Sequence, residues 1–221
     1  YVCDDADIRA AAETLIDGAM FNSGQCCCGI ERIYVAEQHF DRFVAKAVEI
    51  VSAYTLGNPL SEETTLGPMA HVRFAQEVRA QIADAVDQGA TAHIPTFAED
   101  DGGAYLTPQI LTNVTHDMRV MREESFGPVV GIMPVKDDAQ AIALMNDSDF
   151  GLTASIWTQD AARAEAIADQ IETGTVFMNR ADYLDPGLCW TGCKDTGRGG
   201  GLSVIGYHNL TRPKSYHLKK A

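Results

Sequence analysis

Residues 129–178 read VVGIMPVKDDAQAIALMNDSDFGLTASIWTQDAARAEAIADQIETGTVFM, and this stretch decides the fold. Short apolar runs rich in β-branched residues alternate in it with segments of helical periodicity. Strand–helix–strand units join parallel strands through right-handed crossovers, so we expect an α/β fold of three layers, αβα, around a mainly parallel sheet. The alternation predicts strands at 129–134, 152–157 and 175–178, with helices at 139–146 and 161–171 between them.

The part of the chain before residue 129 adds three helices and one strand to this expectation. Apolar side chains recur at i, i+3, i+4 and i+7 through residues 8–19, 40–51 and 74–85. This spacing is typical of helices with one buried face. Residues 32–35 are predicted to form a strand. We expect these helices to pack against the sheet.

Composition and charge limit the classes of function. Hydrophobic residues make up 46% of the 221 residues, enough to build a sizeable core in one domain. The formal net charge of -14 argues against sequence-independent binding to nucleic acid or anionic lipid, which needs clustered Lys and Arg. No apolar run reaches the length of a membrane span. The first residues do not resemble a signal peptide, so we expect a reduced, cytoplasmic protein.

The bend at residues 21–28, FNSGQCCC, holds three of the six cysteines between a predicted helix and a predicted strand. Two packed elements hold such a bend rigidly, which suits a nucleophilic thiol. Core packing is the ordinary alternative for cysteine, but at most alternate side chains among three neighbours can enter one core. Adjacent cysteines rarely satisfy disulfide geometry, and the spacing to Cys189 and Cys193 lacks the usual zinc pattern. The sequence therefore favours a reactive cysteine here.

Four motifs, in order along the chain, resemble those of the aldehyde dehydrogenase superfamily. Residues 21–32 resemble its catalytic-cysteine motif, in which the nucleophile is the second residue after the Gly-Gln glutamine; here that residue is Cys27. Residues 123–129, EESFGPV, are similar to its E-x-F-G-P-V motif, and residues 174–179, GTVFMN, to its G-x-V-x-x-N strand. Residues 190–198 parallel a later glycine-rich segment. The resemblance covers essentially the whole chain.

The resemblance implies an NAD(P)-dependent oxidation of an aldehyde to a carboxylic acid. Cys27 would attack the aldehyde carbonyl as a thiolate, and the thiohemiacetal would lose a hydride to the nicotinamide and become a thioester. Glu124 would accept hydrogen bonds from the hydroxyls of the nicotinamide-side ribose, and Phe126 would pack nearby to fix the pose of the cofactor. The resemblance gives no catalytic part to Cys26 or Cys28 and implies no metal.

The dinucleotide-binding half and the general-base glutamate of the family lie upstream of the position that matches Tyr1. The chain therefore resembles the C-terminal catalytic-domain portion of the family. We expect the complete protein to bind NAD or NADP, and this chain alone to bind neither and to lack dehydrogenase activity. Residues 1–209 would form the catalytic domain, with a return segment near 195–209, and residues 210–221 a C-terminal strand that pairs within a homo-oligomer.

Two other functions are compatible with these residues. Cys27 paired with one of the six scattered histidines would make a cysteine hydrolase or acyltransferase, which turns over esters or amides without nicotinamide. A dehydrogenase-derived domain could also serve as a non-catalytic binding or assembly module through its terminal strand. Retention of Cys27, Glu124 and Phe126 argues against the module, because a scaffold has no need of a cofactor-facing glutamate.

Overall fold

A four-stranded sheet forms the centre of the computed structural model, which describes residues 1–181 and 183–221. The strands lie in the order β2, β3, β4, β1. Strands β1 and β3 run parallel to β4, whereas β2 runs antiparallel to β3. Their bounds are Thr91–Ala92 for β2, Gln109–Thr112 for β3, Val129–Val135 for β4 and Arg32–Ala36 for β1.

Residues 1–3 extend this sheet by linking β1 to a second pair of strands. Val2 forms parallel bridges with Val35 of β1 on one side and with Trp157 on the other. Trp157 directly follows β6 (Thr153–Ile156), which pairs in parallel with β7 (Thr175–Met178). Every one of these pairings except that of β2 with β3 is parallel, which confirms the predicted mainly parallel sheet.

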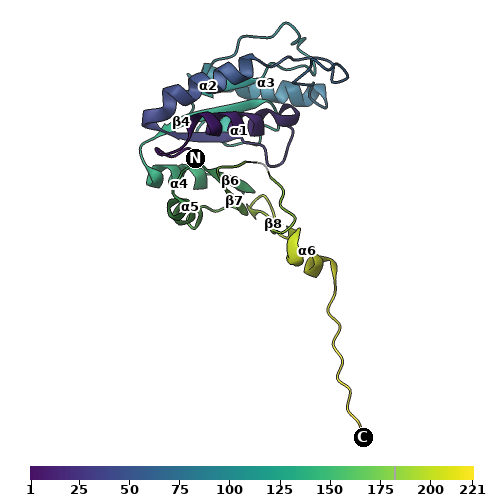
Figure 1. Ribbon diagram of the computed structural model, residues 1–221. Coiled ribbons are helices and arrows are strands. Elements are labelled where there is room, and N and C mark those ends of the chain that lie inside the picture. Colours follow the sequence, from purple (N-terminus) through teal and green to yellow (C-terminus); the bar gives the residue numbers. More distant parts are fainter. Residues whose placement is uncertain (182) are drawn as a thin grey trace.

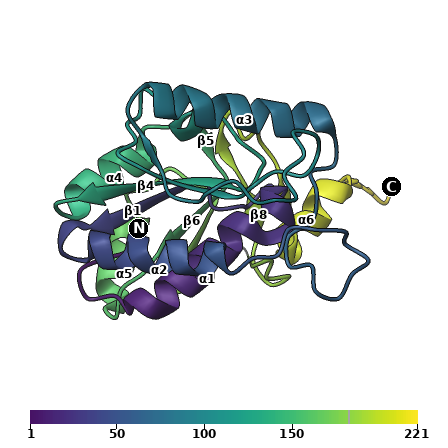
Figure 2. The same ribbon diagram turned by 90° about the horizontal axis from the view of Figure 1, so that it is seen from above.

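Helices cover both faces of the sheet, as the three-layer prediction requires. Helices α1 (Ile8–Met20) and α2 (Phe40–Ser52) bury their apolar sides in one cluster together with Ile33 and Val35 of β1. Tyr34, between these two residues, faces the opposite cluster, because successive side chains of a strand point to opposite faces. Figure 2 shows α3 on one side of the sheet, and α1 and α2 on the other. The second cluster includes residues of α3 (Val72–Asp87), α4 (Asp138–Asn146) and α5 (Ala161–Ala168).

Aspartate side chains fix the starts of three helices. Asp7 accepts hydrogen bonds from backbone N–H groups in the first turn of α1, Asp137 does so for α4, and Asp160 for α5. Such caps satisfy donors that have no partner inside the helix. They therefore set where each helix begins beside the sheet.

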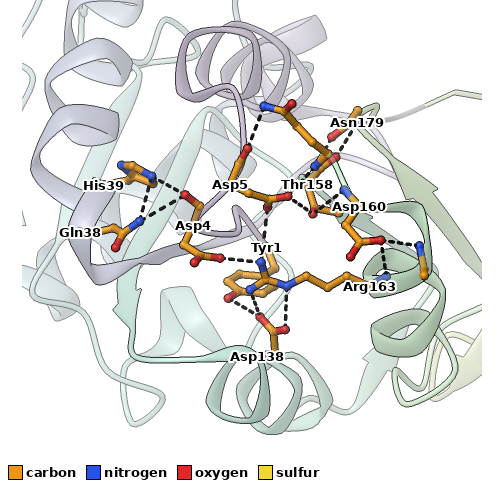
Figure 3. Close-up of polar contacts among 12 residues, drawn as sticks. Tyr1, Asp4, Asp5, Gln38, His39, Asp138, Thr158, Asp160, Arg163 and Asn179 are labelled. Atoms are coloured by element: carbon orange, nitrogen blue, oxygen red, sulfur yellow. Dashed lines mark hydrogen bonds and ion pairs between the residues drawn. The ribbon is translucent and has the colours of Figure 1, made fainter.

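A network of ion pairs joins residues 1–5 to α4 and α5 (Figure 3). The Arg163 guanidinium of α5 donates from Nε and from a terminal nitrogen to Asp138 of α4, at 2.8 and 2.6 Å. Its other terminal nitrogen donates to Asp4 at 2.5 Å. The Tyr1 hydroxyl donates to Asp138 at 2.8 Å. Arg163 of α5 thus connects its own helix to α4 and to the first residues of the chain.

The five elements predicted within residues 129–178 are all present, as are the three earlier helices and the strand at β1. The sequence reading missed β3, the helix α6 (Ser203–Leu210) and several short elements. The short elements that were not predicted are the strand β2 described above and η1 (Phe21–Gly24), η2 (Glu37–His39), η3 (Arg119–Met121), β5 (Phe150–Gly151), β8 (Trp190–Thr191), β9 (Cys193–Lys194) and β10 (Gly200–Gly201).

In the described part of the chain, no helix has both the length and the apolar character needed to cross a membrane.

The C-terminal segment lies apart from the layers. Figure 1 shows α6 beyond β8 and the final residues extending away from it. Residues 211–221 are exposed and have no regular secondary structure. A strand needs a neighbouring edge to pair with, so the oligomerisation strand expected at 210–221 stays a prediction; Leu210 itself ends α6.

Candidate active site

The turn after α1 contains three successive residues in the left-handed conformation. Asn22, Ser23 and Gly24 have φ values of 51°, 58° and 71°, a region that side chains other than Gly, Asn and Asp rarely adopt. The Gln25 side chain then ties the turn to another loop, because its Oε1 accepts a hydrogen bond from the Ala70 amide at 2.7 Å. The cysteine run therefore starts from a fixed position.

The three cysteines that follow have different environments. Cys27 is exposed, Cys26 is half-buried and Cys28 is only 5% exposed. The Gly29 amide donates to the Cys26 carbonyl at 3.0 Å and closes a turn around them. Because solvent reaches Cys27 most freely, the accessible thiol is the residue that the sequence motif singled out.

The cysteine turn packs backbone to backbone against the second motif. A Cβ atom at Gly24 would lie 2.0 Å from the carbonyl oxygen of Gly127, far inside the contact distance of a carbon and an oxygen. Gly127 belongs to the EESFGPV motif at 123–129. The two motifs are therefore neighbours in space, and the glycine at residue 24 is what lets them approach.

Glu31 forms a second link between these motifs, and the sequence reading did not single it out. Its carboxylate accepts hydrogen bonds from the amides of Ser125 and Phe126, at 3.1 and 3.2 Å. Burial raises the pKa of the Glu31 carboxyl, and the amide hydrogen bonds oppose that rise. Phe126 has a φ of 50°, which is unusual for an aromatic residue. The two hydrogen bonds to Glu31 therefore hold the motif in an unusual backbone conformation.

Glu124 and Phe126 line one surface hollow together. The hollow, of about 720 Å³, is also lined by Asn22 and Gln25 of the cysteine turn and by Phe74 of α3. Phe126 and Phe74 remain 39% and 45% exposed, and Glu124 is exposed. The hollow therefore combines the exposed side chain of Glu124 with two accessible aromatic rings.

Cys27 lies on a different cavity, so the structure does not bring all three predicted site residues into one pocket. This cavity, of about 160 Å³, is lined by Cys27 and Glu31 and by residues 32–34 of β1 and 153–155 of β6. Glu31 joins the two spaces, because it lines the cavity of Cys27 and binds the backbone of the motif that carries Glu124.

The third motif, residues 174–179, includes strand β7 and contacts two neighbouring segments. The Asn179 amide group donates to the Thr158 carbonyl at 2.8 Å and accepts from the Thr158 amide at 3.0 Å. A Cβ at Gly174 would lie 1.7 Å from the Thr191 carbonyl oxygen. The glycine and the asparagine of this motif thus connect β7 with the end of β6 and with β8.

The histidines make their hydrogen bonds away from Cys27 in the part of the chain that the structure describes. Among the described residues, no hydrogen bond joins a histidine to Cys27; His116, for example, contacts the Tyr34 hydroxyl at 2.8 Å and Asp147 at 2.7 Å. In the same part of the chain, no group of three or more His, Cys, Asp or Glu side chains is arranged to hold a metal ion. A Cys–His hydrolase therefore has no support in this geometry.

Fold and site define an α/β protein with a mainly parallel sheet, in which a turn that contains Gly24 presents an exposed cysteine. The family described as "Aldehyde dehydrogenase family" matches residues 1–216. The chain belongs to the aldehyde dehydrogenase family.

Curated relatives agree with this assignment. An aldehyde dehydrogenase of Paenarthrobacter nicotinovorans is 39% identical over 97% of the chain and 47% of the relative. A succinate-semialdehyde dehydrogenase [NADP(+)] of Deinococcus radiodurans is 34% identical over 96% of the chain and 45% of the relative. The chain thus spans about half the length of the curated relatives that it matches.

Solved structures share the fold over nearly the whole chain. A structure titled "Structural insights into cofactor and substrate selection by Gox0499" has a TM-score of 0.93 and 37% identity, covering 99% of this chain and 48% of that one. Lactaldehyde dehydrogenase from Escherichia coli has a TM-score of 0.89 and 33% identity, covering 94% of this chain and 44% of that one.

Proposed function

We propose that this chain supplies the nucleophile and part of the nicotinamide-side surface of an NAD(P)-dependent aldehyde dehydrogenase. The observation that carries the proposal is the contact between two motifs. The turn that exposes Cys27 is packed through Gly24 against Gly127, directly after Phe126 in the motif that carries Glu124. A thiol and a candidate cofactor surface are thereby held in fixed relation.

Cys27 has the chemistry that aldehyde oxidation needs. Its thiolate attacks the carbonyl carbon, and the new C–S bond leaves a thiohemiacetal oxyanion. When bound, NAD or NADP supplies the acceptor for the hydride that leaves this carbon. The acyl group remains on Cys27 as a thioester until water releases the carboxylic acid, and a thiolate is a good leaving group in that step. The exposure of Cys27 supports its role as the attacking thiol.

The hollow beside the cysteine turn suits the nicotinamide end of a dinucleotide. Glu124 is an exposed acceptor for ribose hydroxyls, and Phe126 offers an accessible ring for packing. The hydrogen bonds that Glu31 accepts from the Ser125 and Phe126 amides hold Phe126 in place. Glu124 and Phe126 therefore fit the nicotinamide end of NAD or NADP, and they would bind and orient it.

The rest of the catalytic apparatus belongs, in this proposal, to the other half of a complete enzyme. The chain covers 47% and 45% of two relatives, and the family's dinucleotide-binding half and general base have no counterpart within it. We therefore assign the chain alone no dehydrogenase activity and no bound cofactor. In the complete protein, residues 210–221 would add a strand at a homo-oligomer interface.

The test is formation of NADH or NADPH by the purified chain, alone and mixed with the amino-terminal half of the Paenarthrobacter relative. Succinate semialdehyde and betaine aldehyde, taken from the names of relatives, are reasonable first substrates. We expect no turnover by the chain alone and turnover in the mixture. Cys27→Ala should abolish this turnover, whereas the neighbouring Cys26→Ala should retain it. Turnover that survives Cys27→Ala would refute the proposal, as would a well-folded mixture that stays silent.

A further inference from the structure

Two cysteines flank the proposed nucleophile and touch each other. The sulfur atoms of Cys26 and Cys28 lie 3.4 Å apart, whereas Cys27, between them in sequence, is exposed to solvent. The turn closed by the Gly29 amide on the Cys26 carbonyl keeps this arrangement. Residues two apart thus place their thiols together, and the role proposed for Cys27 does not explain this contact.

We propose that Cys26 and Cys28 form a peroxide-reactive dithiol, a modification site distinct from Cys27. Cys26 is the half-buried member of the pair and Cys28 the buried one, so of these two thiols Cys26 is the more accessible to an oxidant. The Cys26 thiolate attacks hydrogen peroxide, breaks the O–O bond and becomes a sulfenic acid while one water leaves. The Cys28 sulfur then attacks the Cys26 sulfur and expels a second water. Two thiols are oxidised to a disulfide, and one peroxide is reduced to two waters.

The geometry favours this pair over bonds to Cys27. A disulfide needs a sulfur separation of about 2.05 Å, so the two atoms must approach by about 1.3 Å from their contact at 3.4 Å. The proposal requires rotation of the two side chains to supply this approach. Bonds between Cys27 and either neighbour would join adjacent residues, which rarely satisfy disulfide geometry.

The disulfide uses the sulfur atoms of Cys26 and Cys28 and not that of Cys27, but it changes the surroundings of Cys27. The bridge would close a small ring around Cys27 and restrict the turn that positions it. Reduction by a dithiol would restore the original state. The inference does not depend on the proposed function, because the product is recognised by its mass and not by aldehyde turnover.

The experiment is peptide mass spectrometry of the full chain after brief treatment with hydrogen peroxide and alkylation of the remaining thiols with iodoacetamide. Trypsin cuts after Arg9 and Arg32, so all three cysteines lie in one peptide, residues 10–32. We expect this peptide to lose the mass of two hydrogen atoms and to carry one alkyl group. Dithiothreitol before alkylation should reverse the loss and give three alkyl groups.

Three single variants decide which sulfurs are joined. Cys27→Ser should keep the mass loss and carry no alkyl group, whereas Cys26→Ser and Cys28→Ala should abolish the loss. Removal of the buried Cys28 side chain could impair folding. Cys26 is only half-buried, so Cys26→Ser tests the same bond with less effect on the core. A mass loss that disappears in Cys27→Ser and persists in Cys26→Ser would overturn the proposal, as would a wild-type peptide that shows no loss.

Discussion

Gly24 and Gly127, from two separate sequence motifs, touch through their backbones. A Cβ atom on Gly24 would lie 2.0 Å from the Gly127 carbonyl oxygen and 2.9 Å from the nitrogen of Pro128. Both obstacles are backbone atoms, which cannot swing aside as the end of a flexible side chain can. This contact sets the distance between the cysteine turn and the surface that carries Glu124, so the position of Cys27 depends on it.

Gly24→Ala should destabilise the protein more than an alanine at another left-handed glycine. Gly102 is a matched control, since its φ of 73° is close to the 71° of Gly24 but a Cβ atom there would have nothing within 4 Å. The left-handed conformation costs alanine about 1–2 kcal/mol at either position, and only Gly24→Ala adds a collision. Chemical unfolding of both variants measures the difference. Equal losses of unfolding free energy would mean that the turn relaxes freely away from Gly127.

Glu31→Gln should change how stability depends on pH. Burial raises the pKa of the Glu31 carboxyl above its usual 4.5, so the folded state binds its proton more tightly than the unfolded state does. The contribution of this group is therefore fully present below pH 4.5 and is lost as the pH rises through the folded pKa. Glutamine does not titrate, so the stability of wild type relative to Glu31→Gln should fall with rising pH.

Melting curves of both proteins between acid and neutral pH check this expectation. Glu31→Ala, in the same series, leaves the Ser125 and Phe126 amides without their carboxylate partner and should be about 1–3 kcal/mol less stable than Glu31→Gln at any pH, because neither variant titrates at this position. A wild type that gains stability over Glu31→Gln with rising pH would show that the amide hydrogen bonds outweigh burial.

The sequence predicted the layers well because periodicity reports burial of one face. The helices at 139–146 and 161–171 were found at Asp138–Asn146 and Ala161–Ala168, each behind an aspartate cap. Strand β3, Gln109–Thr112, was missed because all four residues are buried, which removes the alternation that marks a half-exposed strand. Helix α6 was missed for the opposite reason: with no buried residue, it has no apolar stripe to detect.

The candidate site could be predicted only where a motif is local in sequence. Cys27 could be selected from its neighbours because the Gly-Gln-Cys pattern is contiguous, and the structure exposes it. The role of Glu31 depends on amides 94 and 95 residues away, and as one of thirty-one acidic residues it carries no local mark except its place between a cysteine run and a buried strand. The separate cavities of Cys27 and Glu124 likewise follow from tertiary packing.

Arg163→Met should weaken the junction of α4, α5 and residues 1–5. The guanidinium hydrogen bonds to both carboxylate oxygens of Asp138 and also to Asp4, and its loss leaves these acids close together. We expect a loss of about 1–2 kcal/mol at neutral pH, since part of the network is open to solvent. Arg163 holds the pKa of Asp138 below its usual 3.8, so this contribution is present above pH 3.8 and is lost as the pH falls through the folded pKa.

Thermal unfolding of Arg163→Met and Arg9→Met provides the comparison. Arg9 pairs with Glu13 on the surface of α1, with 76% and 48% of the two side chains exposed. The Arg9→Met variant should therefore have the same melting temperature as the wild type. The deficit of Arg163→Met should shrink in acid, because Asp138 becomes protonated. A deficit that is the same at all pH values would assign the effect to lost packing of the arginine stem.

The three cysteines should react with a thiol reagent in the order of their exposure. Cys27 is exposed, Cys26 half-buried and Cys28 buried, and a reagent must reach the sulfur before it can react. Brief alkylation of the native, reduced chain with iodoacetamide, followed by fragmentation of the peptide 10–32, gives the label at each position. We expect Cys27 to be labelled first and Cys28 last, with the difference lost when the same chain is labelled in urea. If Cys28 reacted as fast as Cys27 in the native chain, the turn would open in solution, and Cys27 would not be the uniquely presented nucleophile.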